Sequence, residues 1–316
     1  MIAPTGVVDI KSPKFAGHET FTLRYGWLKK AVDAVLADPM IFTREDALVT
    51  LGVGKNMVRS IRHWGLATKV LEEDPEQENN RGRHIRSTQL GNLLFGPGGI
   101  DPYMEEPGTL WLLHWNLAST PDGPTSWYWT FYRFAESEFT KERLIAALLD
   151  LAGQAGWSRV AESSLKRDVD CFIRTYVPSP VTKAAVAEDT LDCPLAELGL
   201  IQDVEAGRVY ATFRDERASL PLPVFVYALL DAWATGATTR QTLSFEDIAY
   251  RPGSPGRVFR LSEDALVGYL ERLDEFTNNA LGYDVTAGLR QVYRRREVEP
   301  LDMLKPQKPH RIRAGR

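Results

Sequence analysis

The sequence has little cysteine, no long apolar run and no excess of positive charge. Its 316 residues include only two cysteines, Cys171 and Cys193, too few and too far apart for a zinc knuckle or a disulfide framework. They predict buried, reduced thiols and a cytoplasmic protein. No apolar stretch approaches the ~20 residues that cross a bilayer, and residues 1–15 lack the regions of a signal peptide. The net charge of -4 excludes coating of nucleic acid by bulk charge, so any DNA binding must use local patches.

The signatures of common enzyme classes are missing as well. The chain has no phosphate loop, dinucleotide glycine fingerprint, His-Glu-x-x-His zinc motif or nucleophile elbow. His18, Glu19 and His114 define the alternative, a metal-dependent enzyme. Adjacent residues rarely point toward one site, however, and a lone histidine in an apolar segment is more often a hydrogen-bonded core residue. The sequence therefore favours a non-enzymatic protein without a cofactor or a metal.

The length and the pattern of turns predict several domains in a mainly α fold with small β-hairpin wings. The expected divisions are a winged helix-turn-helix domain at 15–96, a helical middle domain at 97–177, a second winged-helix-like domain at 191–299 and a basic flexible tail at 300–316.

Residues 43–64 read as two short helices joined by the turn Gly52-Val53-Gly54, which is the form of a DNA-binding helix-turn-helix. Thr43 offers a start for the first helix. In the second helix, Val58 and Ile61 must face inward, and no acidic residue occurs between Gly54 and Trp64. The outward faces carry two stripes, Lys55, Arg59 and Arg62 for phosphates and Asn56, Ser60 and His63 for base edges.

The flanking residues predict a wing. Residues 66–72 resemble a strand, and residues 84–95 return as a strand and then a helix. Arg81 and Arg83 lie at the tip of the intervening hairpin, where they could reach a phosphate or the minor groove. The acidic half of the same hairpin argues against DNA because phosphates would repel it; it contains Glu72, Glu73, Asp74, Glu76 and Glu78.

Other segments predict helices in a packed core. An amphipathic helix within 15–39 has Leu28, Val32, Val35 and Leu36 on its apolar face, and residues 109–119 are apolar on nearly every side. The aromatic run 127–134 favours core packing over base stacking because Arg133 is its only basic residue.

Residues 140–155 and 163–177 resemble another helix pair, which is a weaker candidate for DNA binding. The second helix would expose Lys166, Arg167 and Arg174, but Asp168 and Asp170 dilute its charge.

In the last third, Ser244 with Asp247 predicts a helix start, and residues 280–295 contain two expected strands. The segment 251–257 has two prolines, which predict a rigid turn more than a phosphate cradle. The basic tail could hold DNA or an acidic partner; its cations include Lys305, Lys308, Arg311, Arg313 and Arg316.

Five dispersed phrases then identify a family resemblance, from about Phe15 to Arg296. They are FAGHETFTLRYGWLKKA, DPYMEEPGTLWLLHW, LDCPLAELGLI, SPGRVFRLSEDAL and TAGLRQVYRR. Together they resemble the bacterial domain-of-unknown-function family numbered four thousand and seven. The resemblance implies an accessory or regulatory role in anti-phage islands and DNA phosphorothioation-type systems, with partners such as a phosphoadenosine-phosphosulfate-reductase-like protein or an ATPase. It supplies no catalytic residues.

The favoured function is a non-enzymatic DNA-binding protein that contacts double-stranded DNA through residues 54–64 and the basic wing. A protein-docking adaptor is the other alternative beside the enzyme, and the acidic hairpin is its best evidence. A homodimer is an open expectation because winged-helix proteins commonly read paired half-sites, although no zipper-like seam is visible.

Overall fold

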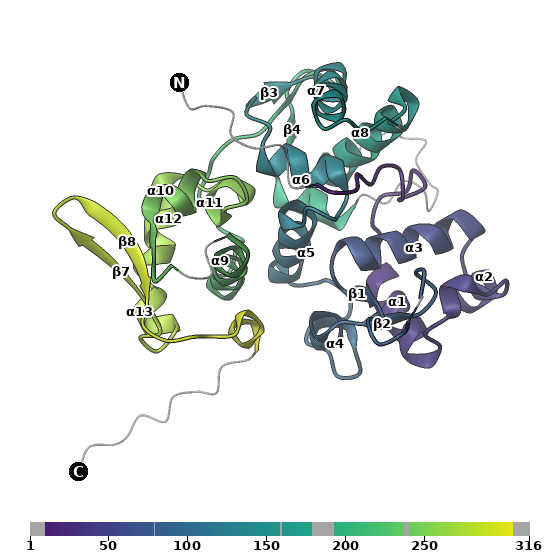
Figure 1. The fold of residues 1–316 in the computed structure, drawn as a ribbon, viewed down its shortest axis with the longest axis horizontal. Coiled ribbons are helices and arrows are strands. Elements are labelled where there is room, and N and C mark those ends of the chain that lie inside the picture. The colour runs from purple at the N-terminus through teal and green to yellow at the C-terminus, as the bar shows by residue number, and fades with distance from the viewer. Residues whose placement is uncertain (1–9, 79, 159, 179–192, 237–239, 306–316) are drawn as a thin grey trace, which may run out of the picture.

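The computed structural model describes residues 10–78, 80–158, 160–178, 193–236 and 240–305. The fold is mainly helical, with three small antiparallel sheets. Figure 1 shows three groups of elements in chain order, with the middle group between the N-terminal and C-terminal groups. One hydrophobic core cluster includes residues of all three groups. No helix among these residues has the length and apolarity needed to span a bilayer.

The N-terminal group combines short helices with a hairpin. Gly52 closes α2 in the left-handed conformation with φ 64°, and Val58, Ile61 and Trp64 form the buried face of α3. Thr43 lies in the preceding 3-10 turn, so the predicted cap at Thr43 is wrong. The elements are α1 (Trp27–Ala37), η1 (Ile41–Thr43), α2 (Ala47–Leu51), α3 (Lys55–Ala67), β1 (Leu71–Glu73), β2 (Ile85–Ser87) and α4 (Gln89–Phe95). The predicted hairpin is confirmed as the antiparallel pair β1 and β2, but the strand expected at 66–72 begins only at Leu71 because α3 continues to Ala67.

The first helix confirms most of its predicted apolar face. Leu28, Val32 and Val35 of α1 are buried, but Leu36 is 50% exposed. The prediction that Leu36 faces the core is wrong because Leu36 lies one helical position beyond the buried stripe, about 100° further around the axis.

The middle group is built around α5 (Pro107–Ser119), which lies near the centre of Figure 1. Ten of its residues are buried, which confirms the expected burial on nearly every side. The aromatic run is mostly helix α6 (Thr125–Tyr132), and its buried Trp127 and Phe131 confirm core packing. The other elements are β3 (Glu138–Phe139), α7 (Lys141–Gln154), α8 (Glu162–Tyr176), η3 (Pro194–Leu198), β4 (Gln202–Asp203) and β5 (Tyr210–Ala211).

One sheet crosses the division expected between 177 and 191. Strand β5 pairs with β3, so Tyr210 lies opposite Phe139, and η3 packs against α5 and α8. Residues 194–211 therefore complete the middle group, although the expected linker at 178–190 precedes them in sequence. Those residues, expected to form a linker, lie almost wholly outside the described part of the chain. Both cysteines are buried and unbridged, as expected.

The C-terminal group contains α9 (Leu222–Gly236), four short helices and a three-stranded sheet. Ser244 accepts a hydrogen bond from the Asp247 backbone N–H, which confirms the predicted start of α10. The expected strands pair as β7 and β8, and β6 adds a third strand. The elements after α9 are β6 (Thr242–Ser244), α10 (Phe245–Tyr250), α11 (Pro255–Val258), α12 (Glu263–Leu270), α13 (Leu273–Phe276), β7 (Leu281–Thr286), β8 (Leu289–Arg294) and η4 (Pro300–Leu304).

The predicted flexible tail begins too early. Residues 300–304 form η4, which packs against α9 because Leu301, Met303 and Leu304 contact the core. Of the predicted tail cations, Lys305 pairs with Asp302, and Lys308, Arg311, Arg313 and Arg316 lie outside the described residues.

Asp168 on α8 connects the segment before α1 to the middle group. We call this segment, residues 10–26, the leader. Asp168 Oδ1 accepts from the Ala16 backbone N–H at 2.6 Å and from His18 Nε2 at 3.0 Å, and its Oδ2 accepts from Ser126 Oγ. The Asp168 side chain is almost completely buried, and the bonds from His18 and Ser126 are buried too, so these two donors have no access to bulk water as a substitute. The expectation that Asp168 is an exposed charge is therefore wrong, because Asp168 shares the buried face of α8 with Leu165 and Phe172.

We expect Asp168→Ala to lower the free energy of unfolding by about 3 kcal/mol or more, because it leaves the buried donors of His18 and Ser126 and the part-buried Ala16 N–H unpaired. Asp170→Ala is the matched control; it removes only the exposed pair with Lys141 and should cost at most about 1 kcal/mol. Urea unfolding followed by circular dichroism measures both. Equal losses would mean that Asp168 does not hold the leader.

Candidate nucleic-acid interface

Helix α3 exposes part of the predicted basic stripe. Lys55, Asn56 and Arg59 are solvent-exposed on the face opposite the core. The Arg59 guanidinium lies 3.3 Å from the Glu19 carboxylate, and more than half of the Arg59 side chain remains accessible. An exposed pair of this kind is weak, so Arg59 can exchange Glu19 for a phosphate at little cost.

Arg62 joins α3 to the hairpin instead of facing solvent freely. Its Nη2 donates to the Gly82 carbonyl at 3.1 Å and lies 3.5 Å from Glu73 Oε1. Arg62 therefore positions the hairpin tip relative to α3.

Ser60 and His63 do not lie on an exposed stripe, which corrects the expectation that they meet base edges. Ser60 is fully buried, and the His63 ring packs between Trp64 and His18, with ring centroids 5.3 and 5.9 Å away. Burial, with a smaller effect of His18, lowers the pKa of His63 to about 3, so His63 is neutral near pH 7. The leader covers this side of α3 closely, since a Cβ on Gly17 would lie 2.6 Å from His63 Nδ1.

The acids of the hairpin are largely paired within the hairpin. Arg86 on β2 lies 2.8 Å from Glu72, 3.6 Å from Asp74 and 3.5 Å from Glu76. With Glu73 beside Arg62, four of the five acids that argued against DNA have a cationic neighbour.

The hairpin tip presents two cations. Arg81 and Arg83 are exposed beside the turn at Gly82, where φ is 72°, and Arg83 Nε donates only to the Asn80 carbonyl. Neither pairs with a carboxylate among the described residues. The exposed set available to a polyanion is thus Lys55, Asn56, Arg59, Arg81 and Arg83; we call it the α3–hairpin face.

The structure does not bring His18, Glu19 and His114 together as one site. His18 Nδ1 accepts from the Thr20 N–H, so its Nε2 carries the proton donated to Asp168. His114 Nε2 donates to the Val258 carbonyl, so its Nδ1 accepts from the Tyr176 hydroxyl. All four ring nitrogens are therefore occupied. The partners Asp168 and Tyr176 are eight residues apart on α8, or about 12 Å along the helix.

His18 is a hydrogen-bonded core residue, and its partner is the Asp168 carboxylate. Sequence reasoning missed Asp168, Ser126 and Tyr176. The helical spacing of Asp168 with Leu165 and Phe172 was the available signal. In the described part of the chain, no group of three or more His, Cys, Asp and Glu residues is placed to hold a metal ion.

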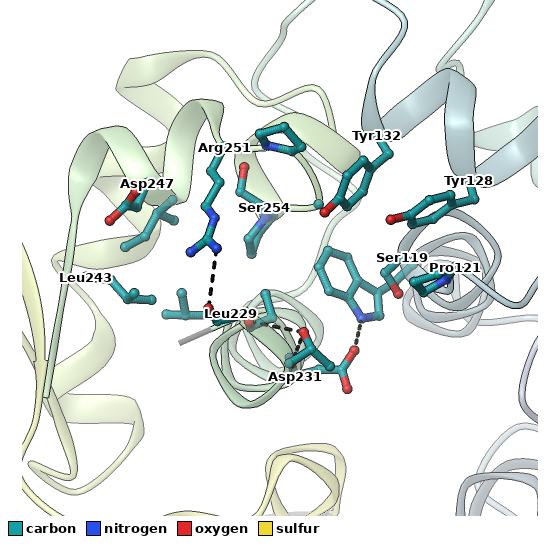
Figure 2. A pocket seen from close by; sticks show the side chains of 18 residues that line it. Ser119, Pro121, Tyr128, Tyr132, Leu229, Asp231, Leu243, Asp247, Arg251 and Ser254 are labelled. Carbon is teal, nitrogen blue, oxygen red and sulfur yellow. Dashed lines mark hydrogen bonds between the residues drawn. The ribbon is translucent and has the colours of Figure 1, made fainter. Parts of the chain in front are cut away.

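A pocket of about 390 Å³ lies between the middle and C-terminal groups, where α5 and α6 meet α9, α10 and the turn before α11. Figure 2 shows Tyr128, Tyr132 and Arg251 around it. Its polar groups are partly satisfied by each other: Trp115 Nε1 donates to Asp231 at 2.8 Å, and Arg251 donates to the Gly236 carbonyl. Asp247 lies 3.5 Å from Arg240. The pocket is thus a mixed polar and aromatic seam without one dominant charge.

The fold and the α3–hairpin face define the class of protein. It is a mainly helical protein of net negative charge that exposes several cations on one helix and the adjoining hairpin. The chain belongs to the family described as protein of unknown function DUF4007, whose model matches residues 15–307. This confirms the resemblance found in the sequence.

The structure is similar to two crystal structures of SspB. The magnesium ion-bound SspB structure has a TM-score of 0.83 and 34% identity, with 93% of this chain and 87% of that chain covered. A second SspB structure has a TM-score of 0.81 and 35% identity, with 92% and 86% covered. A search of curated proteins found no match.

Buried neutral histidine predicts a loss of stability in mild acid. Burial is the main cause that lowers the pKa of His114 from 6.5 to about 3. Below pH 6.5 the unfolded chain therefore takes up a proton that folded His114 does not bind. The contribution of His114 to the free energy of unfolding should fall by about 2 kcal/mol between pH 6.5 and pH 5. We expect the His114→Gln variant to have a lower free energy of unfolding than the wild type at pH 7. Between pH 6.5 and pH 5 that free energy should fall less steeply than in the wild type, as measured by urea unfolding at each pH. An equal pH dependence in both proteins would contradict a neutral, buried His114.

Proposed function

We propose that this SspB-like protein is a non-enzymatic, DNA-binding accessory or regulatory subunit of a bacterial DNA-modification and phage-defence system. In this proposal the N-terminal group acts as a winged helix-turn-helix, with α3 as the recognition helix and β1–β2 as the wing. The C-terminal group, with its sheet β6–β8–β7, acts as a second winged-helix-like unit. The α3–hairpin face contacts double-stranded DNA.

The exposed cations beyond the hairpin acids are the observation that carries this proposal. Arg86 lies within 4 Å of Glu72, Asp74 and Glu76 and offsets one of their three negative charges, which reduces the repulsion of phosphates at the base of the hairpin. Arg81 and Arg83 project beyond that cluster, and Lys55 stands at the start of α3 with no acid in the first turn. Cations at this helix end and at a hairpin tip suit phosphate contacts on either side of a groove.

Asn56 is the side chain on α3 most suited to base readout, because Ser60 is buried and the His63 ring packs against Trp64 and His18. It is exposed one turn before Arg59 and Ser60, and an amide can both donate to and accept from adenine. One such contact provides little sequence discrimination, so we expect this face to bind mainly through phosphates.

The similarity to SspB and the family membership support the biological setting. The family resemblance implies DNA phosphorothioation-type systems, and in this proposal the chain holds the DNA for a modifying enzyme of such a system. Other subunits, such as a reductase-like protein or an ATPase, would be its protein partners.

We expect a variant with Lys55→Gln, Arg81→Gln and Arg83→Gln to bind duplex DNA more weakly. Each lost phosphate contact should reduce the slope of log affinity against log salt by about 0.9. Arg143→Gln is the control, because Arg143 pairs with Glu136 in the middle group, away from the α3–hairpin face. Fluorescence anisotropy across a salt series, with the protein's own upstream DNA and a scrambled duplex, measures both.

The outcomes separate three roles. Binding restricted to the upstream duplex indicates a sequence-reading regulator, and equal salt-dependent binding to both duplexes indicates a DNA-tethering subunit. If the wild type binds neither duplex at low salt, the DNA proposal fails and the alternative of a protein-docking adaptor takes its place. If the triple variant binds as tightly as the wild type, the α3–hairpin face is not the interface.

The magnesium-bound SspB structure favours a second candidate, a magnesium-dependent role. His18 and His114 do not fit this role because their ring nitrogens are occupied. Magnesium prefers one or two carboxylates with water, so exposed carboxylates elsewhere would have to supply the ligands.

We expect DNA affinity to be equal in magnesium and in an equal concentration of calcium, since both ions compete for phosphates, and supercoiled plasmid to remain intact with either ion. Isothermal titration with magnesium, DNA anisotropy and plasmid electrophoresis test this expectation. A magnesium-dependent change in the plasmid would replace the non-enzymatic proposal.

A further inference from the structure

Five arginines gather where α6 meets α11 and the loop before α9; we call them the junction arginines. Arg257 Nη2 donates to the Arg133 carbonyl at 3.1 Å, which brings the C-terminal group against the end of α6. Arg260 Nη2 donates to the Thr130 carbonyl, and its guanidinium carbon lies 5.7 Å from the Phe131 ring centroid. The set is Arg133, Arg214, Arg217, Arg257 and Arg260, which are spread over more than 120 residues of sequence.

Two junction arginines donate hydrogen bonds to several backbone carbonyls and so connect different loops. Arg214 donates to the carbonyls of Ala249, Gly256 and Leu261, and Arg217 donates to those of Gly199, Phe213 and Phe259. Their donors are largely used, so Arg214 and Arg217 hold the turn that carries Arg257 and Arg260.

The other three have unused donors. The Nε atoms of Arg133, Arg257 and Arg260 are buried and lack a hydrogen-bond partner among the described residues. The three side chains are only partly buried, so solvent reaches the cluster. Arg260 is also held in the left-handed region with φ 54°, a conformation that costs a residue with a Cβ about 1 kcal/mol or more.

The charges of the junction arginines are poorly compensated. None of the five pairs with a carboxylate within 4 Å in the described parts of the chain. Asp215 and Glu263 are the nearest opposing charges, and they act on Arg217 and Arg214 respectively. Burial, followed by Arg257, Arg214 and Arg217, lowers the pKa of Arg260 to about 9. The folded chain therefore retains a repulsion that a bound anion would offset.

A purely structural role does not explain this arrangement. Hydrogen bonds to carbonyls account for Arg214 and Arg217, but a neutral amide could donate the single bonds that Arg257 and Arg260 make. The Arg133 guanidinium has no hydrogen bond to protein among the described residues and lies 5.6 Å from the Tyr132 ring. Forked donors without an acceptor are suited to an oxyanion that several arginines share.

We propose that Arg133, Arg257 and Arg260 form a binding site for a phosphate group, supplied either by a DNA backbone or by a free phosphate compound. The site lies at the junction of the middle and C-terminal groups and does not involve the α3–hairpin face. Arg214 and Arg217 position it. The proposal therefore stands independently of the DNA contact proposed for α3.

The first test uses the full chain with inorganic phosphate as the probe. At phosphate concentrations around ten times the dissociation constant, we expect the melting temperature of the wild type to rise by about 2–4 °C relative to chloride at matched ionic strength. Arg133→Gln should abolish this rise. Because its backbone carbonyl stays in place for Arg257, Arg133→Gln should fold, and its melting temperature in chloride should equal or exceed that of the wild type.

Arg143→Gln is the matched control, since Arg143 pairs with Glu136 outside the junction. It should keep the full phosphate response, and so should the triple variant of the α3–hairpin face. An equal response in the wild type and Arg133→Gln, or no response in the wild type, would overturn the site. Arg257→Gln provides a second loss-of-response variant, to be read only if it melts cooperatively.

A duplex DNA titration then distinguishes the two sources of phosphate. If the backbone supplies it, Arg133→Gln should lower the salt slope of DNA binding by about 0.9 while Arg143→Gln leaves it unchanged. If Arg133→Gln binds DNA as the wild type does but has lost the phosphate response, the site serves a free phosphate compound.

Discussion

The buried carboxyl group of Asp168 is the interaction on which the N-terminal half depends. It holds the Ala16 N–H, His18 and Ser126, and so fixes the leader against α6 and α8. The leader in turn covers one side of α3, where Gly17 meets His63 and where Trp64 donates to the Phe21 carbonyl. A buried polar cluster with three donors on one acceptor permits few alternative arrangements, because each lost bond leaves an unsolvated group. The face that α3 presents to solvent is therefore set by a residue more than 100 positions away.

Pairing between charged side chains decides how an acidic protein can expose basic surfaces. Arg86 engages the acids at the base of the hairpin, and Arg62 is used to hold the tip, so the free cations are those at the start of α3 and at the turn. At the junction of the middle and C-terminal groups the reverse occurs. Five arginines converge there without a carboxylate within 4 Å in the described part of the chain, and the backbone carbonyls that four of them bind offset only part of the desolvation. The cations of the α3–hairpin face are exposed, whereas the junction arginines lie between the middle and C-terminal groups. We propose phosphate as the ligand of both.

The histidines show why composition alone was a poor guide to chemistry. His18, His63 and His114 share buried aromatic surroundings, and His63 and His114 are kept neutral by burial. His18 and His114 have both ring nitrogens hydrogen-bonded within the protein. Their role is to connect elements: His18 ties the leader to α8, and His114 ties α5 to α8 and to Val258 in α11.

The sequence by itself determined the local elements and the family. Helical periodicity, the turn at Gly52, the helix expected at 140–155, the cap at Ser244 and the pattern of β7 and β8 depend on residues close in the chain, so they were predictable. Only the tertiary structure decided that Ser60, His63 and Asp168 face inward, that β5 joins β3, and that the junction arginines meet. Each of these depends on which surface a distant segment covers. Local spacing can show that a polar residue lies near an apolar face, but it cannot show which partner, brought from elsewhere in the chain, makes its burial favourable.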